Sequence, residues 1–411
     1  MKTKIFLLLI LFLPFSFSHE IKLVEGDTEK PATIKVLLEK EVQGILLEVK
    51  GPYAVYNPEN GKRESSGKWG KRFYLYPHEN GIKWGENFLG IHQLQIVPTS
   101  GETTILVNGI QYRGSIEVYN IKNQLNIVNE VDIETYIKII LNEKVEETLP
   151  GVILDAIAII ARTDAYYKAL INKDAFWHVN KREVGYNGNA LTLQHLFLDR
   201  AVDHTKYLVM TYKDRPFPAA WTENCAGKTA NYSSILRKKV ATPKGVISPF
   251  AIEKRSDSRW SFTTETQELA KLVKLNRVTK IDLFVDHPSG KVYAIRLHDG
   301  THDEDISFFD LQRKLGKEKL KSNDFNISIK GNIALFEGYG QGHGAGLCLY
   351  SALQMIERGD QVPQILSTFF PNATIQKMRA YPKSLLLNRS PSFPSSKKTE
   401  NIIKKHKILN K

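Results

Sequence analysis

The hydrophobic and polar positions of this chain follow two periods, and each period has its own stretch. Between residues 33 and 131, apolar and polar residues alternate in short runs separated by Gly, Asn and Pro, which predicts an antiparallel sheet. From 132 to 169 the apolar residues recur every three or four positions, which predicts helices. Residues from about 261 to 335 carry both periods, as expected of an inserted α/β segment. We therefore predict an α+β fold: a β-rich N-terminal part, central buried helices, the insertion, and a glycine-rich C-terminal strand followed by helices.

Two helices are predicted between residues 132 and 169. Asp132 is a residue type that caps helix N-termini, and the apolar residues after it form one stripe. The second helix begins near Pro150 and is apolar on nearly all sides up to Arg162, which indicates a buried helix. Its polar residues should face a groove or another buried polar group; they are Asp155, Arg162, Thr163 and Tyr166.

Glu143 falls at the end of the first of these helices. There the negative end of the helix dipole favours the protonated carboxyl group, and partial burial would act in the same direction. A carboxyl group of this kind suits a general acid at neutral pH. The alternative is an ordinary solvated glutamate before a loop.

Two longer motifs follow one another in the chain. The first contains Glu143 and the apolar helix, and comprises Glu134, Tyr136, Ile140, Glu143, Pro150, Ala156, Ala158, Ala161, Arg162, Thr163 and Ala165. The second is rich in glycine, and comprises Gly340, Gly342, His343, Gly344, Ala345, Gly346, Leu347, Tyr350 and Ala352. Together they resemble the signatures of the stage II sporulation protein D family, which includes the amidase enhancers. The resemblance extends over roughly residues 34–387, so we assign residues 33–387 to one catalytic domain of this type.

The resemblance implies a peptidoglycan lytic transglycosylase that acts preferentially on glycan strands without stem peptides and leaves 1,6-anhydroMurNAc ends. Glycoside hydrolysis ordinarily needs two carboxyl groups, whereas in this reaction the 6-hydroxyl of the muramic acid attacks its own anomeric carbon. Glu143 can therefore serve alone, first as acid and then as base, and no cofactor is required. The alternative function is a non-catalytic protein that binds glycan strands or activates a cell-wall amidase.

The resemblance also indicates residues that would bind the glycan. Sugars present apolar ring faces and many hydroxyl groups, so aromatic and hydrogen-bonding side chains suit them. Core packing is the alternative for Tyr186, and a structural ion pair is the alternative for Arg162. His343 could donate to a glycan oxygen, orient Glu143, bind a metal, or be a buried histidine; the alternating glycines around it would let a second backbone or a ligand approach closely. The predicted substrate-binding residues are Arg162, Tyr186, Asn187, Thr222, His343 and Tyr350.

Several residues depart from the family pattern. Lys144 replaces a methionine beside Glu143, and Leu349 replaces a glutamine. Thr222 replaces a histidine in a loop where some members bind zinc, which places a zinc site in doubt; the candidate ligands are Cys225, His343 and Cys348. Because two cysteines in an exported chain suggest a disulfide, we prefer a bridge between Cys225 and Cys348 over free thiols or a metal. The polar cluster at 298–305 is interpreted as a solvated turn rather than a metal site.

The two ends of the chain bear on its location. Residues 1–18 carry lysines, an apolar run and small terminal residues, which predicts a signal peptide cleaved near Ser18; an uncleaved N-terminal anchor is the alternative. Residues 19–32 are assigned to a linker and residues 388–411 to a basic, disordered tail. The net charge of +13 indicates an anionic partner. For an extracytoplasmic protein, a cell-wall or membrane-surface polyanion fits better than nucleic acid.

Overall fold

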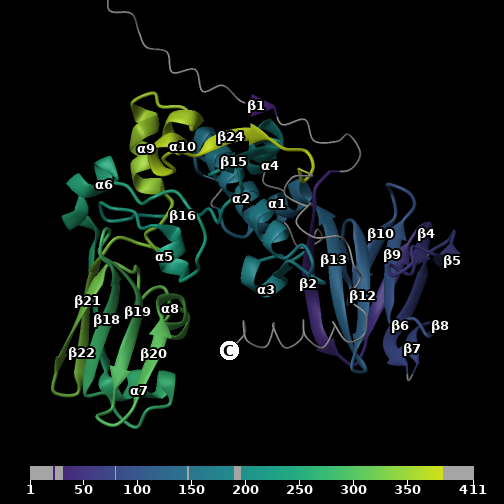
Figure 1. Ribbon diagram of the computed structural model, residues 1–411, viewed down its shortest axis with the longest axis horizontal. Helices are drawn as coiled ribbons and strands as arrows, with labels where there is room; N and C mark the ends of the chain where they lie inside the picture. Colours follow the sequence, from purple (N-terminus) through teal and green to yellow (C-terminus); the bar gives the residue numbers. More distant parts are fainter. Residues whose placement is uncertain (1–21, 24–30, 79, 146–147, 189–195, 383–411) are drawn as a thin grey trace, which may run out of the picture.

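The computed structural model describes residues 22–23, 31–78, 80–145, 148–188 and 196–382 (Figure 1). Helices occur together with antiparallel strands in several separate sheets, which confirms the α+β class. The predicted signal peptide, most of the linker and the basic tail lie outside the described residues. Within the described part of the chain, no helix is long and apolar enough to cross a membrane.

The N-terminal part consists of two sheets, drawn in purple and blue in Figure 1. One has the strand order β14-β2-β13-β12-β9-β4-β5 and the other β11-β10-β3-β6-β7-β8; β14 (Val179–Asn180) pairs in parallel with β2, and the other pairs are antiparallel. Alternate residues of β3 point inward: Ile45, Leu47 and Val49 are at most 2% exposed and share one core with residues of the seven-stranded sheet. The strands are β2 (Thr33–Val42), β3 (Ile45–Lys50), β4 (Tyr53–Tyr56), β5 (Arg63–Gly67), β6 (Lys71–His78), β7 (Gly81–Trp84), β8 (Glu86–Leu89), β9 (Gln93–Pro98), β10 (Thr104–Val107), β11 (Ile110–Tyr112), β12 (Ser115–Ile121) and β13 (Gln124–Asp132).

The central helices form where the apolar period predicts them. Asp132 caps α1 (Ile133–Asn142), since its carboxylate accepts a hydrogen bond of 2.9 Å from the Thr135 N–H. Helix α2 (Gly151–Ile171) is buried along most of its length. It packs against α1, α4 (Leu196–His204) and β15 (Leu208–Thr211), and the short α3 (Lys181–Val184) follows it in the chain. The apolar circumference of α2 is therefore explained by contacts on several sides.

The C-terminal part returns to these helices. Strand β24 (Thr374–Lys377) pairs with β15 and with β1 (Lys22–Leu23), while β23 (Leu347–Cys348) runs parallel to β16 (Trp221–Thr222). Helices α9 (Leu349–Glu357) and α10 (Val362–Phe369) lie beside this sheet (Figure 1). These pairings place the glycine-rich segment beside the loop that contains Cys225.

The inserted segment has a core of its own. It forms two three-stranded antiparallel sheets, β17-β22-β21 and β18-β19-β20, shown in green in Figure 1. His298 lies between Asp282 and Asp303 on neighbouring strands, and the described residues contain no group of three His, Cys, Asp or Glu side chains placed to hold a metal ion. The elements from 232 to 339 are α5 (Tyr232–Leu236), α6 (Pro249–Glu253), the 3₁₀ helix η1 (Arg255–Ser258), β17 (Arg259–Glu265), α7 (Thr266–Val273), β18 (Lys280–Asp286), β19 (Lys291–His298), β20 (Asp303–Ser307), α8 (Phe308–Leu315), β21 (Phe325–Lys330) and β22 (Ile333–Tyr339).

Candidate active site

Glu143 is the C-cap residue of α1, and its backbone N–H donates to the carbonyl oxygen of Leu141. Its side chain therefore leaves the backbone at the C-terminal end of this helix. The residue is exposed, so the partial burial that we expected is absent. An exposed carboxyl group at the end of a rigid helix is open to a polymeric substrate.

The loop after α3 runs beside Glu143. Gly185 has a φ of +69°, a conformation that favours glycine. A Cβ atom at this position would lie 3.6 Å from Cβ of Glu143 and 3.7 Å from Cε of Lys144, so both side chains pass close to this glycine. Asn187, two residues further on, is exposed and is in reach of a ligand that contacts this loop.

Charged side chains from other elements gather around Lys144. On α2, Asp164 and Lys168 form an ion pair of 2.7 Å, and Lys317 follows the end of α8. Lys144 has an exposed surface, yet the protein around it reduces the hydration of its ammonium group. This enclosure, and then the charge of Lys168, lower the pKa of Lys144 to about 8; Asp164 opposes the shift and Lys317 adds to it.

His343 projects from the glycine-rich segment into an aromatic cluster. Its ring stacks on Tyr232 with 5.3 Å between centroids and 27° between planes, and Phe309 of α8 lies 6.1 Å away. Burial lowers the pKa of His343 to about 4, so the ring is uncharged at neutral pH; its Nδ1 accepts a 3.3 Å hydrogen bond from the Ala345 N–H. Burial also raises the pKa of Tyr232 well above its usual value, so its hydroxyl group keeps its proton.

The side of this segment without side chains faces the protein itself. Gly340, Gly342, Gly344 and Gly346 all have positive φ angles, between 62° and 93°. A Cβ atom on Gly342 would lie 2.3 Å from Oγ1 of Thr222, and one on Gly346 would lie 2.0 Å from the carbonyl oxygen of Ala220. The alternating glycines are expected to admit either a second backbone or a ligand. In the structure it is a second backbone, that of residues 220–226, that approaches them closely.

Thr222 and Tyr350 hold this backbone contact together. Thr222 is 0% exposed; its hydroxyl group donates to the carbonyl oxygen of Gln341 at 2.9 Å and accepts from the Gly344 N–H at 3.2 Å. The backbone N–H of Tyr350 donates to the carbonyl oxygen of Glu223 at 2.9 Å, and its side chain is half-buried. Thr222 therefore bonds to the segment that carries His343 and presents no group to solvent.

Comparison with known proteins agrees with the two motifs. A family model described as "Stage II sporulation protein" (SpoIID) matches residues 121–212, which include the whole of α1 and α2. An uncharacterized protein of Chlamydia pneumoniae is 38% identical over 211 residues, which cover 49% of this chain and 77% of that protein. The chain belongs to the stage II sporulation protein D family.

Further relatives support this assignment. An uncharacterized protein of Chlamydia muridarum is 38% identical over 179 residues, 43% of this chain and 62% of the relative. The stage II sporulation protein D of Bacillus amyloliquefaciens is 24% identical over 189 residues, 45% of this chain and 52% of the relative. Membership of the SpoIID family suggests a role connected with the cell wall.

In this SpoIID-family chain, two further residues predicted to bind glycan lie in the interior, as Thr222 does. Arg162 is 0% exposed and makes an ion pair of 2.7 Å with Glu134; its other donors reach Thr205 and the carbonyl oxygens of Val202 and Leu208. Tyr186 is also 0% exposed, and its hydroxyl group donates to Oδ1 of Asn129 at 2.6 Å. Neither side chain reaches the surface. Arg162 therefore forms a structural ion pair and Tyr186 packs in the core, and the prediction that they bind glycan is not supported by their positions.

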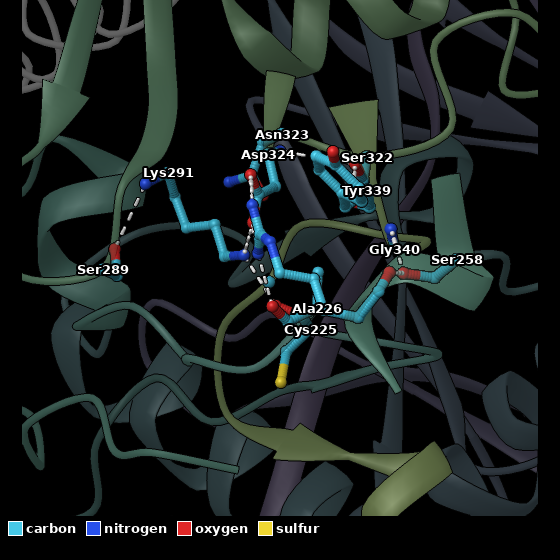
Figure 2. Close-up of polar contacts among 12 residues, drawn as sticks. Cys225, Ala226, Ser258, Ser289, Lys291, Ser322, Asn323, Asp324, Tyr339 and Gly340 are labelled. Atoms are coloured by element: carbon cyan, nitrogen blue, oxygen red, sulfur yellow. Dashed lines mark hydrogen bonds and ion pairs between the residues drawn. The ribbon is translucent and has the colours of Figure 1, made fainter. Parts of the chain in front are cut away.

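The two cysteines lie together beneath the glycine-rich segment. The Cys225 N–H donates to Sγ of Cys348 at 3.3 Å, and both thiols are free and buried. Figure 2 shows that Lys291 and Asp324 of the insertion hold the Cys225 loop: Nζ of Lys291 donates to the Cys225 carbonyl oxygen and to Asp324, each at 2.6 Å. Two sulfur atoms supply half of a tetrahedral zinc site, and the described residues bring no third ligand of the usual kinds to them.

Sequence reasoning missed several members of this site. Asp164 and Lys168 are separated by four positions on α2, so their spacing alone indicates that they share a helix face. Tyr232, Phe309 and Lys317 come from segments with no recognisable motif, and only the fold brings them toward His343 and Lys144.

Proposed function

We propose that this protein is an exported lytic transglycosylase, which cleaves the β-1,4 bond between MurNAc and GlcNAc in peptidoglycan with Glu143 as its catalytic residue. The observation that carries the proposal is the exposed carboxyl group of Glu143 at the end of α1, beside the loop of Gly185 and Asn187. Its position in the matched family segment, and the connection of the family with the cell wall, support the same conclusion.

One carboxyl group is sufficient for a balanced reaction. Protonated Glu143 gives its proton to the glycosidic oxygen as the bond between C1 of MurNAc and that oxygen breaks, and GlcNAc leaves with a free hydroxyl group. The carboxylate then takes the proton of the MurNAc 6-hydroxyl as O6 bonds to C1, which restores the acid. No water is consumed, and the attacking oxygen belongs to the same sugar, so attack is favoured by proximity.

The surrounding residues suit a sugar substrate. Tyr232 keeps its proton and the ring of His343 is uncharged at neutral pH, so this cluster offers aromatic surface and hydrogen bonding without a second ionised group. We propose no metal-dependent step, because the residues that the structure describes place no third ligand of the usual kinds beside the two cysteines. The predicted export and the net charge of +13 support a location outside the cytoplasm, in contact with an anionic wall or membrane surface.

A second candidate function is a non-catalytic protein that binds glycan strands or activates a cell-wall amidase. The observation that favours it is the burial of Arg162, Tyr186 and Thr222. With these side chains inside, fewer of the predicted polar groups remain to bind a transition state.

One experiment separates the two functions. The mature protein and its Glu143→Gln variant are incubated with peptide-free glycan strands, and the new ends are identified by mass spectrometry. We expect 1,6-anhydroMurNAc ends from the native protein and none from the variant. Glu102→Gln, at an exposed glutamate of the N-terminal β-rich part, is the control and should remain active. Binding without cleavage by the native protein would favour the second function, and ordinary reducing ends would indicate a hydrolase.

A further inference from the structure

The charges beside Glu143 have no role in the proton transfers proposed above. Cβ of Glu143 and Cε of Lys144 lie at similar distances, 3.6 Å and 3.7 Å, from the Cβ position of Gly185. The two side chains therefore leave α1 over the same glycine. A ligand that reaches the carboxyl group of Glu143 also comes within reach of the Lys144 ammonium group.

The local balance of charge around Lys144 is positive. Lys168 and Lys317 act on Lys144 as like charges, and Asp164 acts as the opposite charge. Asp164 is already paired with Lys168 at 2.7 Å, so it neutralises little of the remaining charge. Phe309, on the helix α8 that precedes Lys317, contacts the ring of His343, which places α8 beside the glycine-rich segment. An anion entering here would gain attraction from several cations that now repel one another.

We propose that Lys144, with support from Lys168 and Lys317, binds the free lactyl carboxylate of the muramic acid residue whose glycosidic bond is cleaved. The inference rests on the proposed function and names the substrate group that the site selects. The lactyl ether is the acidic group of the glycan backbone, and its carboxyl group is free once the stem peptide has been removed. This carboxyl group belongs to the same MurNAc unit whose glycosidic bond Glu143 would cleave. Glu143 and Lys144, which are adjacent in the chain, would therefore contact two neighbouring groups of one sugar.

The chemistry of lysine fits this role. An ammonium group is a compact charge with three donors, and its hydrogen bonds to a carboxylate are charge-assisted. The methionine found at this position in the family pattern could not make them. An alternative role for Lys144 is to adjust Glu143 by its charge. That effect would alter the turnover of every glycan equally, whereas a carboxylate subsite distinguishes glycans that carry the group from those that lack it.

The test measures binding separately from catalysis. In the Glu143→Gln background, dissociation constants are measured by calorimetry for peptide-free murein strands and for chito-oligosaccharides of equal length, which have no carboxylate. We expect a preference for the murein strands of about tenfold. Lys144→Met should remove this preference, Lys144→Arg should keep most of it, and Lys330→Met, at an exposed lysine of β21, should leave it unchanged.

The other results would overturn the proposal. Equal affinity for murein strands and chito-oligosaccharides in the Glu143→Gln variant that retains Lys144 would rule out a carboxylate subsite. An equal loss of affinity for both glycans on Lys144→Met would rule it out as well. Murein strands that retain stem peptides should bind more weakly; equal or tighter binding would mean that Lys144 recognises a carboxylate of the peptide. Failure of the proposed function is a distinct result, since the native protein would then not cleave strands although the binding preference persisted.

Discussion

The backbone N–H of Cys225 points at the sulfur of Cys348 across 3.3 Å, although 122 residues separate the two in the sequence. Their side chains are 1% and 0% exposed, so a bond between them would be protected from external thiols. The two thiols are free in the structure, and we predict that they form a disulfide under oxidising conditions. Its reduction should lower the free energy of unfolding by about 2–4 kcal/mol, measured by urea denaturation with and without reductant.

The control for the disulfide is Cys348→Ala, which should unfold at the same urea concentration with and without reductant. Alkylation of the unreduced, denatured protein gives the opposing result: two modified cysteines would mean that the thiols remain free.

The ion pair between Arg162 and Glu134 leads to a prediction on stability. Because Arg162 is 0% exposed, Arg162→Met removes the cation paired with Glu134 and the donor to the carbonyl oxygens of Val202 and Leu208. We expect a loss of about 3–5 kcal/mol in the free energy of unfolding. Lys138→Met removes the more exposed pair with Asp203 and should cost less than about 1 kcal/mol. Similar losses of unfolding free energy in both variants would show that the buried ion pair stabilises the fold no more than the exposed one.

Two glycines allow the steric contact of the glycine-rich segment to be measured. Gly342→Ala places a methyl group 2.3 Å from Thr222 and at a φ of +93°, whereas Gly331→Ala also has a positive φ, +61°, but meets nothing within 4 Å. Gly331→Ala should destabilise by about 1 kcal/mol through its backbone alone. Gly342→Ala should cost clearly more and reduce binding of glycan strands, because His343 must move. Equal melting temperatures for the two variants would contradict this.

His178 and His343 predict a dependence of stability on pH. Burial lowers the pKa of each to about 4, from 6.5. The folded protein therefore holds these rings uncharged while the unfolded chain takes up protons, so stability is present above pH 6.5 and is lost as the pH falls toward 4. The loss should be on the order of 1–3 kcal/mol for each. His178→Gln should flatten the pH profile measured by chemical denaturation, and the exposed His287→Gln should not.

The sequence predicts the helices and strands of this protein better than the tertiary contacts that their side chains make. Period-two and period-three-to-four patterns locate the sheets and the central helices, because burial of one face repeats at the period of the backbone. The position of Glu143 follows from the end of an apolar stripe. The pattern does not tell whether a polar residue in that stripe faces a substrate or another part of the protein. The pattern therefore predicts Arg162 and Tyr186 at the glycan, whereas their side chains bond to Glu134 and Asn129, which lie 28 and 57 positions away in the sequence.

The site itself depends on contacts over long sequence distances. Tyr232 precedes the insertion and Phe309 lies within it, yet both contact His343, and no local pattern marks them. The inserted segment also supplies Lys291, whose buried ammonium group fixes the carbonyl oxygen of Cys225. Such a residue resembles any surface lysine until its surroundings are known.

The positions of the glycine-rich segment differ in whether they can accept a substitution. At positions 340, 342, 344 and 346, a side chain of any size would clash with the neighbouring backbone or with side chains around it. Substitution of these glycines is therefore disfavoured. Gln341 lies between two of these glycines and is exposed, so exchange there leaves the framework intact. A descendant of this protein can therefore acquire a different specificity by substitution at this position while the motif that marks its ancestry remains readable.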